Sequence, residues 1–238
     1  MGVPSWVNQV QKRAVKSIFL VSGAGEVMLV EEAALSAVGL GLPVDRSAGL
    51  LIVDVGGGKT EAAIVSMGGV VVGKGIKTAG DNLDEAIMNY LKMKYGLLVG
   101  KNSAERIKME IGNVGEGSGR EVLAKGRDLE TGLPRGIKVN ESEIREAIIL
   151  EASKIVKLVR EVLDEAPPEL MDEVMKRGIT LVGNGSKLKG LGELIEKDTR
   201  INVRVAEEPG LSVVRGGEEL IRKREILKQI KLVSGFKQ

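Results

Sequence analysis

The sequence predicts an α/β fold in which a five-stranded mixed sheet carries helices and a small α+β unit is inserted. Three short apolar segments follow one another within residues 49–77, and Gly68-Gly69 separates the last two. Glycine permits the positive φ of a tight turn, so this pattern predicts an antiparallel meander. In residues 168–232 strand-like apolar segments alternate with helical patterns, which is typical of parallel strands joined by helices.

Residues 1–48 contain two predicted helices and one predicted strand. Val10–Phe19 has helical apolar spacing, Glu26–Val30 has the composition of a short strand, and Glu31–Leu40 is predicted as a helix that ends near Gly41. A lone strand cannot make a stable sheet, so its edges and the apolar helix faces need to be covered.

The meander and the inserted unit come next in the chain. Apolar runs bounded by glycines and turn residues predict the strands, and Asn102 or Ser103 is the expected N-cap of the second helix. In chain order the elements are strands at Gly49–Val55, Glu61–Met67 and Val70–Lys77, helices at Asp84–Lys94 and Ser103–Ile111, and a hairpin of Glu121–Leu129 with Gly136–Asn140.

The last part of the chain returns to the sheet. A long helix, Glu141–Leu163, ends before Pro167-Pro168, because proline cannot continue a helix. The remaining predicted elements are helices at Pro168–Met175, Leu188–Lys197 and Ser212–Leu232, strands at Gly178–Val182 and Asn202–Val205, and a turn at Gly183-Asn184-Gly185.

The composition restricts the chemistry. The chain has 238 residues, is 43% hydrophobic and 29% charged, and has a net charge of +2 with dispersed basic residues, so no nucleic-acid partner is indicated. It has neither cysteine nor histidine, which excludes disulfides and thiolate or imidazole ligands. No run approaches the roughly 18–20 apolar residues of a membrane span. We expect a cytoplasmic protein whose chemistry uses carboxylates, lysines, hydroxyls and backbone amides.

The most informative segment is a buried strand that runs into an aspartate and three glycines. Asp54 stands at the end of the apolar run Leu50–Val53, and Gly56, Gly57 and Gly58 follow. Glycines let a ligand approach the backbone N–H groups, and a neighbouring carboxylate suits a divalent cation. The pattern predicts a site for phosphates with a metal ion, although an ordinary tight hairpin has the same sequence.

Short matches at consistent spacing run through nearly the whole chain. They are Val3-Pro-Ser, Glu31-Glu32 with Gly41-Leu-Pro-Val, Asp54-Val-Gly-Gly-Gly-Lys-Thr-Glu, Ala79-Gly-Asp, Asp84-Glu-Ala-Ile, Ala104-Glu-Arg-Ile-Lys, Gly126-Arg-Asp-Leu, Pro167-Pro-Glu-Leu and Arg177-Gly-Ile. In these segments the chain resembles the MreB family of bacterial actins and, more widely, the superfamily of actin, sugar kinases and heat-shock chaperone ATPases.

The resemblance implies an actin-like, ribonuclease H-like fold. Residues 1–48 would be a remnant of the first large subdomain, residues 49–80 and 151–238 the second, and residues 81–150 an inserted small α+β subdomain. Most of the first large subdomain, with its own phosphate hairpin, is expected to be absent. We therefore expect residues 1–48 to swap or pair with another chain, or to pack back in a non-family arrangement.

The resemblance also implies that ATP and Mg²⁺ bind in a cleft. Asp54 would lie beside the magnesium ion. Lys59 stands where the family commonly has threonine, so it either adds a positive charge near the terminal phosphates or points away from an exposed turn. The implied phosphate loop consists of Gly56, Gly57, Gly58, Lys59 and Thr60.

Glu32 would position the attacking water by accepting its hydrogen bond or proton. Its alternative role is that of an acid placed favourably at a helix N-terminus. Phosphoryl transfer needs charge neutralisation from both sides of the phosphates. With one phosphate loop expected to be missing, we expect weak nucleotide binding and negligible hydrolysis by the chain alone.

Two further pairs are implied at the pocket wall. Glu105 and Lys108 would hold the ribose and the adenine, but their spacing also fits a solvated pair on one helix face. Gly80 and Asp81 would close another side of the pocket, or only cap the following helix.

The base and the α-phosphate would approach the backbone at Gly183, Asn184 and Gly185. Asn184 replaces the usual glycine, although asparagine tolerates the left-handed conformation. Lys187 replaces a small apolar residue, which puts the affinity for the base in question.

The resemblance implies a cell-shape protein that assembles into filaments, by self-association or with an N-terminal-half or full-length actin-like partner. The alternative is a non-catalytic truncated relative that binds a partner chain, and a third interpretation is part of a kinase or phosphatase of the superfamily. Membrane contact is not indicated, although Trp6 and Leu232-Val233 are candidate exposed anchors.

Overall fold

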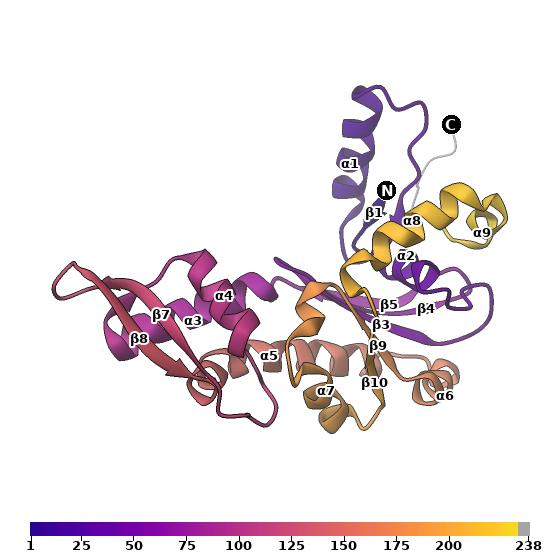
Figure 1. The fold of residues 1–238 in the computed structure, drawn as a ribbon. Helices are drawn as coiled ribbons and strands as arrows, with labels where there is room; N and C mark the ends of the chain where they lie inside the picture. Colours follow the sequence, from indigo (N-terminus) through magenta and orange to yellow (C-terminus); the bar gives the residue numbers. More distant parts are fainter. Residues whose placement is uncertain (233–238) are drawn as a thin grey trace.

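A computed structural model describes residues 1–232, and its centre is a five-stranded mixed sheet (Figure 1). The strand order is β10-β9-β3-β4-β5, with antiparallel pairing in the meander and parallel pairing of β3, β9 and β10. This confirms the predicted sheet. The strands are β3 (Leu50–Val55), β4 (Thr60–Ser66), β5 (Gly69–Ile76), β9 (Ile179–Val182) and β10 (Val203–Val205).

Helices cover both faces of this sheet. In β3, Leu51 and Val53 belong to one apolar core and Leu50 and Ile52 to the other, because successive strand residues point to opposite faces. The first core contains residues of α5 (Glu141–Asp164), α6 (Pro168–Arg177) and α7 (Leu191–Thr199). The second contains residues of α2 (Glu32–Gly39) and α8 (Ser212–Arg222), with α9 (Arg224–Gln229) beside it.

The inserted unit extends from one end of the sheet (Figure 1). It contains α3 (Gly80–Tyr95), α4 (Lys101–Ile111) and a three-stranded sheet of β6 (Leu97–Leu98), β7 (Glu121–Asp128) and β8 (Pro134–Asn140) in the order β6-β7-β8. One expectation was wrong and one strand was missed. The N-cap of α4 is Gly100, so Asn102 and Ser103 lie inside the helix. The two-residue strand β6 was not predicted.

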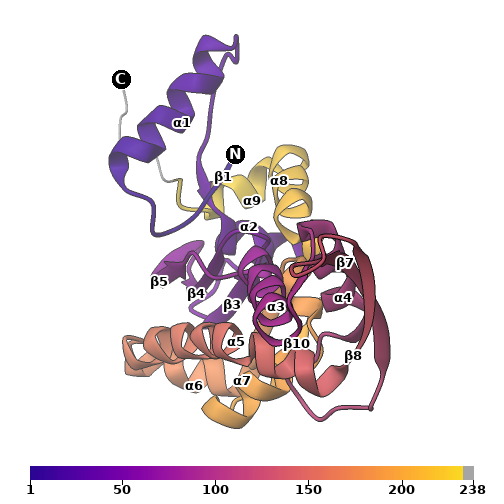
Figure 2. The ribbon, with the colours of Figure 1, turned by 90° about the vertical axis from the view of Figure 1, so that its left-hand side faces the viewer.

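The N-terminal segment has two strands instead of one. β1 (Gly2–Val3) pairs in parallel with β2 (Val30–Glu31), so the predicted strand Glu26–Val30 is wrong except at its last residue. Between them, α1 (Gln9–Val21) projects from the body (Figure 2).

Contacts of the segment just before α1 fix it to the sheet. Trp6 lies against Gly75 of β5, where a Cβ atom would overlap the indole ring. A Cβ on Gly73 would likewise overlap the hydroxyl of Ser5. The candidate anchor Trp6 is thus largely engaged with its own chain and is 38% exposed.

Helix α2 packs on its own chain through a close backbone approach to α8. A Cβ on Gly39 would overlap the carbonyl oxygen of Ser212, and a Cβ on Gly216 would overlap that of Leu35. Ala33 is fully packed in this layer at 2% exposure. In this structure α2 is thus covered by elements of its own chain.

The C-terminal part differs from the prediction at two places. Lys223, with φ −116° and ψ 88°, divides the expected single helix Ser212–Leu232 into α8 and α9. The predicted helix Leu188–Lys197 begins only at Leu191, because a 3₁₀ turn over Asn184–Lys187 precedes it. Leu232 is 41% exposed, and Val233 lies outside the described residues. None of the helices in residues 1–232 is long and apolar enough to span a bilayer.

Adjacent glycines in α8 give a matched test of the α2–α8 contact. Gly216→Ala should lower the free energy of unfolding by about 1–3 kcal/mol, because the added methyl group meets backbone that cannot yield. At Gly217 no atom lies within 4 Å of the position that a Cβ would occupy, so Gly217→Ala should stabilise the helix by about 0.5–1 kcal/mol. Urea unfolding of both variants measures the difference, and equal effects would contradict this packing.

Candidate functional site

The loop between β3 and β4 offers backbone amides to an open space. Its turn is closed by the Gly56 N–H, which donates to the Lys59 carbonyl at 3.0 Å. Gly57 and Gly58 are exposed, and within residues 1–232 their amides donate no hydrogen bond. No atom lies within 4 Å of a Cβ position on Gly57. Free amides on a glycine loop of this kind are suited to an anion.

The start of α3 holds this loop in place. Gly80 N–H donates to Gly56 O at 3.2 Å, and Asp81 N–H donates to Gly57 O at 2.8 Å. The Asp81 carboxylate is in turn 3.0 Å from the ammonium of Lys101. Gly80 and Asp81 therefore act first as supports of the loop, and their own amides are engaged by protein.

Thr60 is a structural residue at the end of the same loop. Its hydroxyl donates to Thr78 O at 2.6 Å, and the residue is completely buried. The sequence placed Thr60 among the phosphate contacts, but in the structure its hydroxyl faces protein and is not open to a ligand.

Asp54 lies where β3 and β9 end side by side. Its register partner in β9 is Val182, and the next residue, Gly183, has φ +77°. A Cβ on Gly183 would overlap the Asp54 carboxylate, and a Cβ on Gly185 would be 2.6 Å from Val55 Cγ1. Gly183 is therefore needed for the backbone to pass this carboxylate, and Gly185 for it to pass Val55 at the end of β3.

Asn184, by contrast, has no positive φ. The tolerance of asparagine for that conformation is not used here. Asn184 is exposed and its side chain lies against Gly210, where a Cβ would be 2.6 Å from Asn184 Oδ1. Lys187 is also exposed.

An acidic wall lies behind the loop. Asp54 and Glu61 are direct cross-strand partners of β3 and β4, and a third carboxylate, Glu32, comes from the start of α2. Burial raises the pKa of Asp54 to about 6, the charge of Glu32 acts in the same direction, and Lys59 opposes both. Burial likewise raises the pKa of Glu61 to about 7, against the hydrogen bond from the Ser5 N–H.

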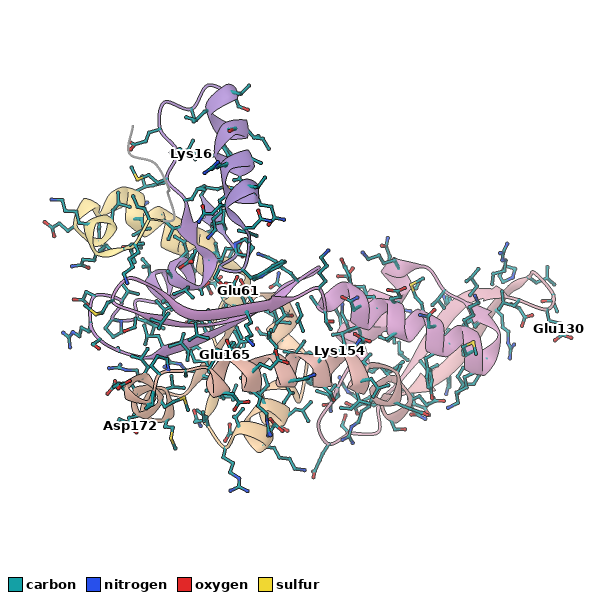
Figure 3. The ribbon with its side chains drawn as sticks, turned by 180° about the vertical axis from the view of Figure 1, so that it is seen from behind. Lys16, Glu61, Glu130, Lys154, Glu165 and Asp172 are labelled. Atoms are coloured by element: carbon teal, nitrogen blue, oxygen red, sulfur yellow. The ribbon has the colours of Figure 1, made fainter. Side chains whose placement is uncertain are left out.

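Glu61 was not recognised from the sequence. It is 2% exposed, and the Ser5 N–H donates to its Oε1 at 2.9 Å, while Oε2 has no partner within residues 1–232. Figure 3 shows it on the sheet, below the helix that carries Lys16. The sequence did contain a signal, because Glu61 is a charged residue opposite Asp54 across a predicted hairpin. Charged residues are rarely buried in a covered strand unless they are paired or functional.

Lys59 is the basic side chain that contacts this wall. Its ammonium forms an ion pair with the Glu32 carboxylate, and the two side chains are 36% and 18% exposed. The interpretation in which Lys59 points away from an exposed turn is therefore wrong. Glu32 is also the first residue of α2, so both of its predicted roles are compatible with its position.

The inserted unit contributes Lys108 to the neighbourhood of the loop. Lys108 Nζ donates to Gly80 O at 3.0 Å and is 2.8 Å from the Asp84 carboxylate. Glu105, one turn earlier on α4, is exposed, and its charge acts on Asp84. The structure thus brings Lys108 to Gly80, which supports the β3–β4 loop, and leaves Glu105 at the surface.

The donors present fit a polyphosphate better than a bare metal ion. No group of three or more Asp or Glu side chains in the described residues could hold a metal ion. Asp54 is one carboxylate beside open amides. Mg²⁺ is commonly bound by one or two carboxylates together with substrate phosphates.

Comparison with known proteins decides the family. The model of the MreB/Mbl protein family matches residues 1–229. The chain belongs to the MreB/Mbl family. It is similar to the cell shape-determining protein MreB of Escherichia coli K12, with 44% identity over 90% of this chain, and to Mbl of Bacillus subtilis 168, with 38% identity over 87%. It spans 62% of the length of each.

Solved structures confirm the actin-like fold. MreB5 of Spiroplasma citri bound to AMPPNP is 33% identical, with a TM-score of 0.89 over 95% of this chain and 68% of that one. The ADP-bound MreB5 structure is equally similar. A MamK double helical filament, 22% identical with a TM-score of 0.77, shares the fold. The expected non-family arrangement of residues 1–48 is therefore wrong.

The buried carboxyl of Glu61 predicts a pH-dependent stability. Its pKa is about 7 in the folded chain against an ordinary 4.5, so folding favours the protonated form. Stability is then lost as pH rises from about 4.5 through 7. Glu61→Gln keeps an acceptor for Ser5 and should be more stable than the natural chain by about 1–3 kcal/mol at pH 8, with little difference at pH 4.5.

Urea unfolding at several pH values measures this difference. Glu121→Gln, at an exposed position of β7, is the matched control and should leave the pH profile unchanged. Parallel profiles for the natural chain and Glu61→Gln would contradict a raised pKa.

Proposed function

We propose that this chain binds ATP with Mg²⁺ at the β3–β4 loop and acts as an MreB-type cell-shape protein. The observation that carries the proposal is the pair of exposed, unpartnered amides of Gly57 and Gly58 beside the Asp54 carboxylate, within the part of the chain that the structure describes. Support comes from MreB5, solved with AMPPNP and with ADP at 33% identity. The chain spans 62% of the length of its curated relatives, so the activity of the whole relatives is only proposed for this chain.

In this proposal the loop amides hold phosphate oxygens and Asp54 addresses the metal ion. Gly183 and Gly185 let the backbone after β9 pass close to the end of β3, and the nucleoside would lie beside this backbone. Lys108 and Glu105 would face its sugar and base from α4. The chemistry that ATP supplies when bound is a phosphoanhydride open to attack by water.

Turnover is expected to be slow while Glu32 is paired with Lys59. Glu32 is the residue proposed to orient the water, but it is engaged with Lys59 here. A carboxylate bound to an ammonium is a poorer acceptor for a water proton, because its lone pairs and charge are already used. We propose that Glu32 cannot orient the water as long as this ion pair is intact.

Filament assembly is the second part of the proposal. The curated relatives are named cell shape-determining proteins, and the fold is shared with a chain solved as a double helical filament. We propose that the chain assembles into a filament either with copies of itself or with a longer actin-like chain. The subdomain division at residues 48, 80 and 150, and a cytoplasmic location, belong to the same proposal.

Calorimetric titration with MgATP tests the nucleotide site. Asp54→Ala should weaken binding at least about tenfold, since a charge-coordinating contact is worth roughly 1.5–3 kcal/mol. Asp172→Ala on α6, which Figure 3 shows on the other side of the sheet from α1, is the control and should bind like the natural chain. Absence of heat in all three proteins would end the proposal.

A further inference from the structure

The Lys59–Glu32 ion pair joins two elements that are distant in the sequence. Lys59 is the last loop residue before β4, and Glu32 is the first residue of α2. The lysine side chain is 36% exposed and has a flexible stem, and Lys59 directly follows Gly57 and Gly58, whose amides are open. One ammonium is therefore within reach of both a protein carboxylate and a ligand at the loop.

The Lys59 ammonium stands among more negative groups than positive ones. The charge of Glu32 acts on both Asp54 and Glu61, and Lys59 is the cation that opposes it at both buried carboxyls. Asp54 and Glu61 are directly opposite in the β3–β4 register, where like charges repel. An anion that approaches the loop meets this wall, and Lys59 is the charge that can offset it.

We propose that Glu32 and the terminal phosphates of a nucleotide compete for Lys59, so that the Lys59–Glu32 ion pair is an internal brake on nucleotide binding. The inference rests on the proposed function. Glu32 here takes the place of a phosphate oxygen, since both are anionic acceptors for the ammonium. When a nucleotide phosphate binds the Lys59 ammonium, the Glu32 carboxylate is released. Glu32 and the phosphate weaken each other's binding to Lys59 by the same factor, because such coupling is reciprocal.

Competition makes a prediction that simple repulsion does not. If Glu32 only repelled phosphate, its neutralisation would tighten binding by the same factor whether or not Lys59 is present. If it withholds the lysine, the gain depends on Lys59. A double-mutant cycle separates these cases, because it isolates the coupling between the two side chains.

The experiment measures Kd for MgATP and for AMP with four proteins: the natural chain, Glu32→Gln, Lys59→Met and the double variant. Glu32→Gln should tighten MgATP binding about tenfold, and Lys59→Met should weaken it about tenfold, as expected for one charge-assisted contact. In the Lys59→Met background, Glu32→Gln should change Kd less than about twofold. AMP, with one phosphate, should shift less in every comparison.

Controls keep the outcome clear. Circular dichroism checks that each variant is folded, and Lys59→Arg, which keeps the charge, should retain MgATP binding where Lys59→Met loses it. An equal gain from Glu32→Gln with and without Lys59 would overturn the competition. MgATP binding that is unchanged in Lys59→Met would overturn it as well. If none of the proteins binds MgATP, the proposed function itself fails, which is a different result from either of these.

Discussion

The antiparallel register of β3 with β4 is the constraint on which the site depends. It sets Asp54 opposite Glu61 and leaves Gly56–Lys59 as the loop between them, so the position of each group follows from one hairpin. A slip of one residue would move these carboxylates to the opposite face of the sheet. The face is specified by the core, because Leu50 and Ile52 pack under α2 and α8 while Leu51 and Val53 pack under α5.

The same constraint explains why acidic groups are tolerated beside open amides. Burial and the charge of Glu32 hold the pKa values of Asp54 and Glu61 above their ordinary range, and Lys59 offsets part of that cost. Stability is thus sacrificed locally, as is usual where a protein places charge for a ligand. The close α2–α8 packing and the two apolar cores supply the compensation elsewhere.

The long elements could be predicted from sequence because their patterns are long enough to show a period. Helix α5 is an example, whereas the meander was predicted from apolar runs bounded by glycine turns. The two-residue strands β1, β2 and β6 could not, since two residues have no period. The division at Lys223 was missed because the apolar pattern continues across it. At the site, glycine spacing identified the loop, but the Lys59–Glu32 pair joins residues whose contact depends on how α2 sits on the sheet.

The contact of the Trp6 indole with Gly75 restricts which substitutions can accumulate at these two positions. The indole occupies the volume that any side chain at position 75 would need. A larger residue there is tolerated only after the tryptophan has been replaced by something smaller, because in the reverse order the new side chain would overlap the indole. The two positions are therefore coupled in evolutionary history, and the order in which they drift is fixed by sterics.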